Sequence, residues 1–190
     1  YIPNPKRLSE LTSQFSDNTL DATQAWTKHI SDEAELDGLP DSAKAGAADR
    51  AKADGKDGWL LTLDAPVFIA VMSHCRNAEL RKDMYVAWTT RASDQGPQAG
   101  QFDNAAIMDE ILKLRHEQAQ LLGFANYGEE SLATKMARDV NEVMQFLEDL
   151  ARRAKPQAEQ ELAELKAFAA EQGADDLNPW DIGFWSERLR

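Results

Sequence analysis

The stretch His116–Gln120 reads His-Glu-Gln-Ala-Gln and comes close to a zinc-peptidase motif. In the motif His-Glu-x-x-His, two imidazoles one helical turn apart reach the same metal ion, and the glutamate between them activates the bound water. Here Gln120 stands in the second histidine position, and its amide is a poor zinc ligand. His116 also falls just outside the apolar arc of its predicted helix. We therefore interpret His116 as a helix-edge side chain.

The other two histidines also lack the partners that catalysis would need. His74 precedes Cys75, but neighbours on a helix do not face each other, so a Cys/His nucleophile pair is not expected. The single cysteine closes no disulfide within the chain, and we predict a buried thiol. His29 has no nearby acid or nucleophile. The sequence thus predicts no catalytic, cofactor-binding or metal-binding residue, and no cofactor, in this chain.

Two further groups of side chains, one acidic and one aromatic, could bind a ligand. Both patterns are more typical of a structural role. The acidic segment Asp32–Asp37 lacks the alternating spacing and central glycine of a calcium-binding loop, which favours a solvated charged turn. Trp180, Phe184 and Trp185 could line a groove, but aromatic side chains dominate buried area, so we favour a place in the core.

The charge balance restricts the kinds of partner. The 190 residues contain 33 Asp and Glu against 21 Lys and Arg, a formal net charge of −12. This sign disfavours nucleic acid, since phosphate binding needs a surplus of basic residues, and it disfavours an anionic membrane surface. The apolar run Ala65–Met72 is far shorter than the roughly 20 residues that cross a bilayer, and no secretory signal is visible. We expect a cytoplasmic protein without a nucleic-acid or membrane partner.

Hydrophobic spacing predicts a mostly α fold, a multi-helix lobe with a small two-stranded β element, in one helical segment over residues 1–190 after an irregular start at 1–5. Asn77 is the expected N-cap of one helix, and Pro156 should kink or break another. The predicted helices cover residues 6–21, 40–55, 65–75, 78 onward, 104–122, 141–173 and 178 onward, and the predicted strands cover 25–30 and 59–63.

Several collinear stretches together resemble one known family. They are Asp21–Thr23, Trp26–Thr27, Asp32–Leu36, Trp59–Pro66, Thr90–Pro97, Leu114–Phe124, Asn126–Tyr127, Ser131–Ala137 and Pro179–Ile182. From about Lys6 to Arg190 the chain resembles the bacterial, oligopeptidase A-like branch of the thimet oligopeptidase and neurolysin family of zinc metallopeptidases.

The resemblance implies a largely helical lobe that walls a narrow channel for short peptides. In that family the His-Glu-x-x-His helix and the third zinc ligand, a glutamate, lie downstream of the stretch resembled here. No position of this chain matches a catalytic or metal-binding residue of the family. We therefore expect the non-catalytic part of a longer enzyme, inactive alone, whose partners are short peptides and the remaining catalytic portion. Zinc would belong to that complete enzyme.

A free-standing helical interaction module without enzymatic activity is the alternative. Such a module should end in caps or polar tails, whereas Arg188–Arg190 ends inside what should be a continuing helix. The enzyme-segment hypothesis instead predicts an exposed apolar patch where the rest of the lobe would pack, larger than the few hundred Å² usual for monomers.

Overall fold

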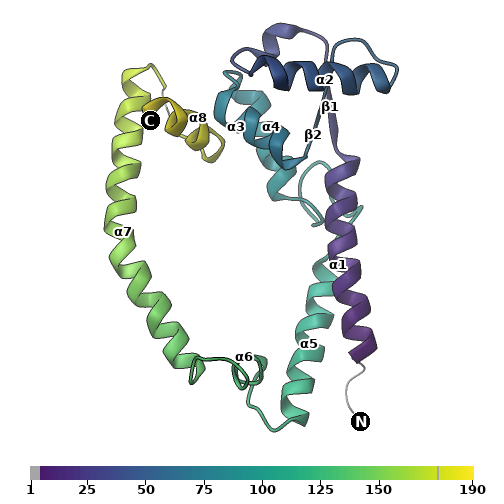
Figure 1. The fold of residues 1–190 in the computed structure, drawn as a ribbon, viewed down its shortest axis with the longest axis vertical. Coiled ribbons are helices and arrows are strands. Elements are labelled where there is room, and N and C mark those ends of the chain that lie inside the picture. Colours follow the sequence, from purple (N-terminus) through teal and green to yellow (C-terminus); the bar gives the residue numbers. More distant parts are fainter. Residues whose placement is uncertain (1–4, 175) are drawn as a thin grey trace. The chain divides into compact units, whose positions relative to one another are not determined.

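The computed structural model describes residues 5–174 and 176–190 and confirms a mostly helical chain with one small β element (Figure 1). The strands are β1 (Thr27–Ile30) and β2 (Trp59–Thr62), and two 3₁₀ turns are η1 (Glu33–Leu36) and η2 (Pro179–Asp181). The helices are α1 (Pro5–Ala25), α2 (Asp41–Ala53), α3 (Ala65–His74), α4 (Ala78–Thr89), α5 (Ala105–Leu121), α6 (Tyr127–Leu132), α7 (Val140–Glu171) and α8 (Ile182–Leu189).

The chain forms two compact units, and α1 and α7 contribute residues to both. The first unit takes residues up to 17 together with 104–162, and the second takes 18–103 together with 163–190. A single helical segment over 1–190 stays a prediction. Of the irregular start predicted at 1–5, residues 1–4 lie outside the described residues and Pro5 begins α1.

The second unit is built around a two-stranded antiparallel sheet whose strands are separated in sequence by η1 and α2. Strands β1 and β2 pair antiparallel, with Ile30 opposite Trp59, and α2 lies against β2. Gly58, just before β2, has φ +87°, and a Cβ there would come within 2.3 Å of the Ile30 carbonyl oxygen, so only glycine fits. The core of this unit consists of Ile30, Leu36, Leu39, Ala47, Leu61, Leu63, Val71, Cys75, Leu80, Met84 and Ala87.

Helices α3 and α4 continue this core. The side chain of Asn77 accepts hydrogen bonds from the backbone N–H groups of Glu79 and Leu80, which confirms the predicted N-cap of α4. Helix α3 packs on one side, against α4, α8 and β2. Val71 is fully buried, whereas Ile69 on the other side is 60% exposed.

The first unit packs the beginning of α1 against α5. Its buried cluster is Leu11, Ile107 and Ile111, with Leu8 and Leu114 packed against it. Arg7 on α1 donates two parallel hydrogen bonds of 2.7 Å to the carboxylate of Glu110 on α5. These bonds lower the pKa of the Glu110 carboxyl. The short helix α6, which has no counterpart among the predicted helices, contacts α5 and is capped by Asn126.

Helix α7 runs unbroken for 32 residues although Pro156 lies in its interior. Of the two predicted outcomes, a kink or a break, the break is therefore absent. A proline removes one backbone donor, and the carbonyl of Arg152, four residues earlier, loses its helical partner. Both residues are exposed, so water can bond that carbonyl, and side-chain pairs one turn apart, such as Lys155 with Glu159, support the helix around it.

No helix of the described residues is long and apolar enough for a membrane span.

Replacing Pro156 with alanine should raise the free energy of unfolding by about 1–3 kcal/mol, because it restores the missing donor and removes the steric cost of the ring. Urea titration followed by far-UV circular dichroism measures the change. Gln157→Ala, at the neighbouring exposed position, is the control and should stay within about 0.5 kcal/mol of the wild type. Equal stability of Pro156→Ala and the wild type would contradict this account of α7.

Candidate functional site

The structure gives His116 and Gln120 no shared ligand-binding role. His116 is exposed on α5, as the helix-edge interpretation predicted. The side-chain amide of Gln120 donates to the carbonyl oxygens of Phe124, at 3.3 Å, and Ala125, at 2.8 Å. Gln120 thereby fixes the loop that follows α5.

The resemblance implies a zinc ion for the family. The residues that the structure describes contain no set of side chains that could bind it. Within 5–174 and 176–190, no three side chains of His, Cys, Asp or Glu are grouped so that they could hold a metal ion. These residues therefore do not fit a catalytic zinc site. That this chain carries no metal or catalytic residue stays a prediction.

The adjacent residues His74 and Cys75 do not form a nucleophile pair. Cys75 is fully buried at the end of α3, and its thiol donates to the carbonyl oxygen of Glu35 at 3.5 Å. Burial raises the pKa of the Cys75 thiol, so it stays protonated and unreactive at neutral pH. His74 is half-buried at the end of the same helix.

The acidic segment Asp32–Asp37 is a charged turn, as expected. Asp32 caps η1 by accepting a hydrogen bond from the backbone N–H of Ala34. Glu33 pairs with Lys44, and Asp37 pairs with Arg76, both at 3.2 Å. Two of the carboxylates are thus partnered by basic side chains of the same unit.

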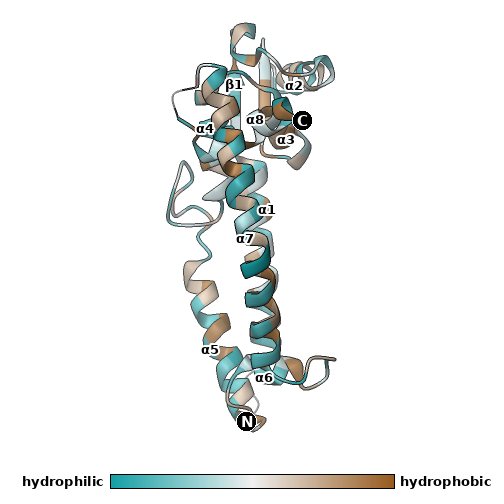
Figure 2. Cartoon of the chain, turned by 90° about the vertical axis from the view of Figure 1, so that its left-hand side faces the viewer, coloured by the Kyte–Doolittle hydropathy of each residue, from teal (hydrophilic) through white to brown (hydrophobic). Residues whose placement is uncertain are grey.

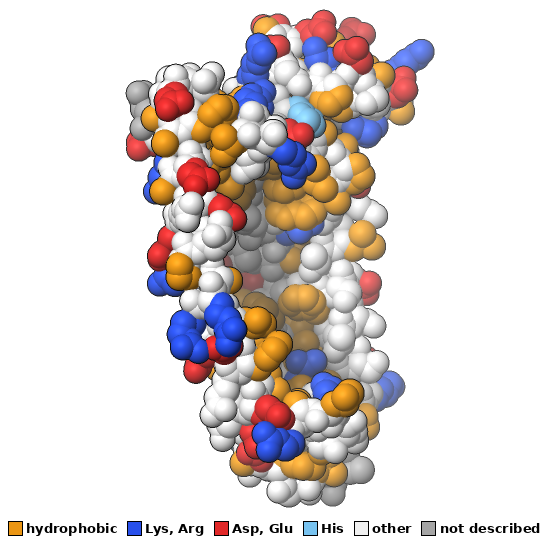
Figure 3. Space-filling model, turned by 60° about the vertical axis from the view of Figure 1, so that its left-hand side comes forward, with side chains coloured by type: hydrophobic (Ala, Val, Ile, Leu, Met, Phe, Trp, Pro, Cys, Tyr) orange, Lys and Arg blue, Asp and Glu red, His pale blue; other side chains and the backbone are white. Residues whose placement is uncertain are grey.

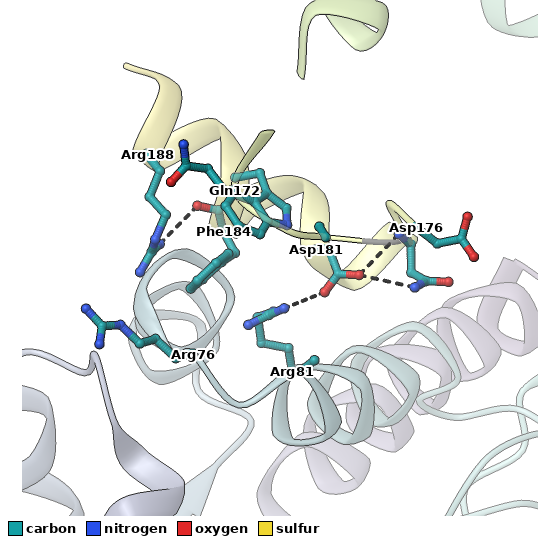
Figure 4. Close-up of a pocket in the computed structure, with 11 residues that line it drawn as sticks. Arg76, Arg81, Gln172, Asp176, Asp181, Phe184 and Arg188 are labelled. Carbon is teal, nitrogen blue, oxygen red and sulfur yellow. Dashed lines mark hydrogen bonds and ion pairs between the residues drawn. The ribbon is translucent and has the colours of Figure 1, made fainter. Parts of the chain in front are cut away.

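The second unit contains an open pocket of about 620 Å³ next to α4, the end of α7 and α8 (Figure 4). It combines three arginines with two aspartates and two aromatic rings, so charged groups dominate its polar lining. The lining residues are Arg76, Ala78, Arg81, Gln172, Ala174, Asp176, Asn178, Asp181, Phe184, Trp185 and Arg188.

A buried ion pair forms the floor of this pocket. Arg81 is 3% exposed and Asp181 is 5% exposed, and an Nη2 hydrogen of Arg81 is donated to the Asp181 carboxylate (Figure 4). The other terminal nitrogen of Arg81 donates to the Cys75 carbonyl oxygen at 2.6 Å. The second carboxylate oxygen of Asp181 accepts from the backbone and side-chain N–H groups of Asn178, each at 3.2 Å.

Phe184 lies between two guanidinium groups in the same pocket (Figure 4). The guanidinium carbons of Arg81 and Arg188 lie 4.2 and 3.4 Å from the centre of its ring. Phe184 is buried, as the core interpretation predicted, whereas Trp180 and Trp185 are half-buried. Phe184 and Trp185 also line the pocket, as the groove alternative predicted. The arginines of this pocket were not predicted from the sequence. The local sequence indicated only a helix start near Asn178, because Arg81 lies 100 residues away from its carboxylate partner.

Several helices expose large apolar side chains. Figure 2 shows apolar residues along α5 and α7, and Figure 3 shows hydrophobic side chains open to solvent. At the beginning of α7, Met144, Phe146, Leu147 and Leu150 are 48–62% exposed. On α5, Met108, Leu112 and Leu121 are also exposed, between 46% and 64%. Exposure of this kind typically marks a surface that a partner or another part of a protein covers.

The fold and the site define a mostly helical segment with an arginine-rich pocket, and the comparisons identify its family. Residues 71–190 match peptidase family M3, and the chain belongs to this family. It is 60% identical over 185 residues to oligopeptidase A of Salmonella typhimurium and 59% identical to oligopeptidase A of Escherichia coli. A probable cytosolic oligopeptidase A of Arabidopsis thaliana is 46% identical over 195 residues. Each comparison covers 97% of this chain but only 27% of the relative.

Breaking the buried pair should destabilise the second unit strongly. Arg81→Met leaves the Asp181 carboxylate buried without its cation, which should lower the free energy of unfolding by about 3–5 kcal/mol. The double variant Arg81→Met/Asp181→Asn leaves no unpaired charge, so it should lose less than the sum of the two single variants. Urea denaturation measures all three.

The matched control is Arg153→Met, because Arg153 pairs with Asp149 on the exposed surface of α7. An exposed pair contributes about 0–1 kcal/mol, so this variant should be nearly neutral. If Arg81→Met lost no more stability than Arg153→Met, the pair would not hold the C-terminal segment to α4.

Proposed function

We propose that this chain is a non-catalytic helical part of a zinc metalloendopeptidase of the oligopeptidase A kind, which cleaves short peptides in the cytoplasm. The observation that carries the proposal is the match to oligopeptidase A, which extends over 97% of this chain but 27% of the relatives. The remaining catalytic portion would supply the zinc ligands and the glutamate that activates water.

In this proposal the chain positions the substrate and takes no part in the chemical step. Rigid helices that wall a narrow channel position an extended peptide and exclude folded proteins, which raises the effective concentration of the scissile bond at the reacting groups. The exposed apolar side chains of α5 and α7 support the proposal, since surfaces of this kind suit contact with the remaining portion of such an enzyme. The same exposed side chains would also suit contact with a separate partner, so a free-standing helical interaction module stays the alternative.

The proposal predicts that the 190-residue chain alone does not hydrolyse a quenched-fluorescent peptide, with or without added zinc, because no zinc ligand set is found among its described residues. A chimera in which this chain replaces the matching segment of Escherichia coli oligopeptidase A should cleave the same peptide, because the two segments are 59% identical. Initial rates at equal protein concentration provide the measurement.

Variants of the chimera test the structural role. Leu150→Glu places a charge on the exposed apolar part of α7 and should reduce cleavage, whereas Arg153→Glu, on an already charged part, should change it little. A correctly folded chimera that cleaves nothing, or zinc-dependent cleavage by the chain alone, would refute the proposed function.

A further inference from the structure

Arg188 keeps part of its guanidinium group free to bind a ligand. One terminal nitrogen, Nη1, donates to the carbonyl oxygens of Phe184, at 3.1 Å, and Ser73, at 3.4 Å. Within the described residues its Nε and Nη2 donate no hydrogen bond, and no carboxylate forms an ion pair with Arg188. Nε and Nη2 form the edge of the guanidinium plane that matches the two oxygens of a carboxylate.

The free edge of Arg188 is held in place. Its guanidinium stacks 3.4 Å from the centre of the Phe184 ring, and this ring is itself buried between Arg188 and Arg81 (Figure 4). The two carbonyl oxygens that accept from Nη1 further restrict the orientation of the guanidinium. A preorganised guanidinium loses less side-chain entropy when a ligand binds than a free surface arginine does.

The charges around Arg188 favour a monoanion. Burial lowers the pKa of Arg188, and repulsion from Arg76 and Arg81 lowers it further. Arg81 is neutralised by Asp181, and Arg76 has an exposed partner in Asp37.

Acidic groups limit how much negative charge the pocket accepts. Asp176 lines the same pocket, and Glu187 precedes Arg188 on α8. These carboxylates repel a dianion such as phosphate more strongly than a single carboxylate, which carries half the charge. Arg76 also lines the pocket, and its Nε and Nη2 have no hydrogen-bond acceptor in the described part of the chain.

We propose that Arg188 and Arg76 form a carboxylate-binding site in this pocket. Arg188 provides the bidentate fork and Arg76 a second cationic donor. The ligand carries one carboxylate, either the terminal carboxylate of a peptide or the side chain of an aspartate or glutamate. The site depends on contacts within the second unit alone, so it does not depend on the proposed function.

Nuclear magnetic resonance of the ¹⁵N-labelled 190-residue chain tests the site through the Nε–H signals of its arginines. The probes are N-acetylglycine, which has a terminal carboxylate, and N-acetylaspartic acid α-amide, which has only a side-chain carboxylate. Neutral N-acetylglycinamide and sodium chloride at equal ionic strength are the controls. We expect the Arg188 signal to shift saturably with at least one carboxylate, with a dissociation constant on the order of millimolar, as suits one charge-assisted bidentate contact.

Matched variants separate the site from general charge effects. Arg188→Gln should abolish saturable shifts of the other pocket signals, and Arg76→Gln, which keeps the Phe184 stack, should weaken binding about tenfold. Arg190→Gln removes the same charge from the same end of the chain, outside the pocket lining, and should leave binding unchanged.

The two probes also identify the source of the carboxylate. Saturation by N-acetylglycine alone supports a peptide terminus, and saturation by the aspartate probe alone supports an acidic side chain. Shifts that are linear in concentration, equal with the neutral amide or salt, or equally weakened by Arg190→Gln would overturn the site.

Discussion

The buried ion pair between Arg81 and Asp181 is the constraint on which the second unit depends. A charge without a partner is costly inside a protein, so each of these two side chains requires the other and the surrounding hydrogen-bond partners. The pair joins α4 to the turn before α8 across 100 residues of sequence. It thereby fixes one terminal segment of the chain against the central core of the unit.

The position of α8 follows from this pair and not from its own helix propensity. Helices of fewer than about 12–15 residues are marginal in water by themselves, and α8 has 8 residues. Contact with α3 and the capping box between Asn178 and Asp181 hold it in place. Only in that position does Phe184 lie between two arginines, and only then does Arg188 present a fixed guanidinium edge.

A second feature is the exposure of apolar side chains on α5 and at the beginning of α7. In α7, only Leu165 and Ala169 are buried, so most of this 32-residue helix is stabilised without a core. Ion pairs one turn apart, such as Arg138 with Glu142, help, but each such exposed pair contributes only a few tenths of a kcal/mol. The chain belongs to peptidase family M3 and spans 27% of the length of a relative that it matches. Exposed apolar side chains are consistent with such partial coverage, because other parts of a longer protein can cover them.

The sequence by itself determined the features that depend on short-range patterns. Hydrophobic periodicity predicted the two strands and the helices other than α6, local chemistry predicted the Asn77 cap, and collinear motifs predicted the family. Neighbouring residues could not show that the helix containing Pro156 stays unbroken, since that depends on solvent at the freed carbonyl. Tertiary structure alone decided that Arg81 meets Asp181 and that an arginine-rich pocket forms beside them. The physical reason is that ion pairs depend on distance in space, whereas a local pattern records only distance along the chain.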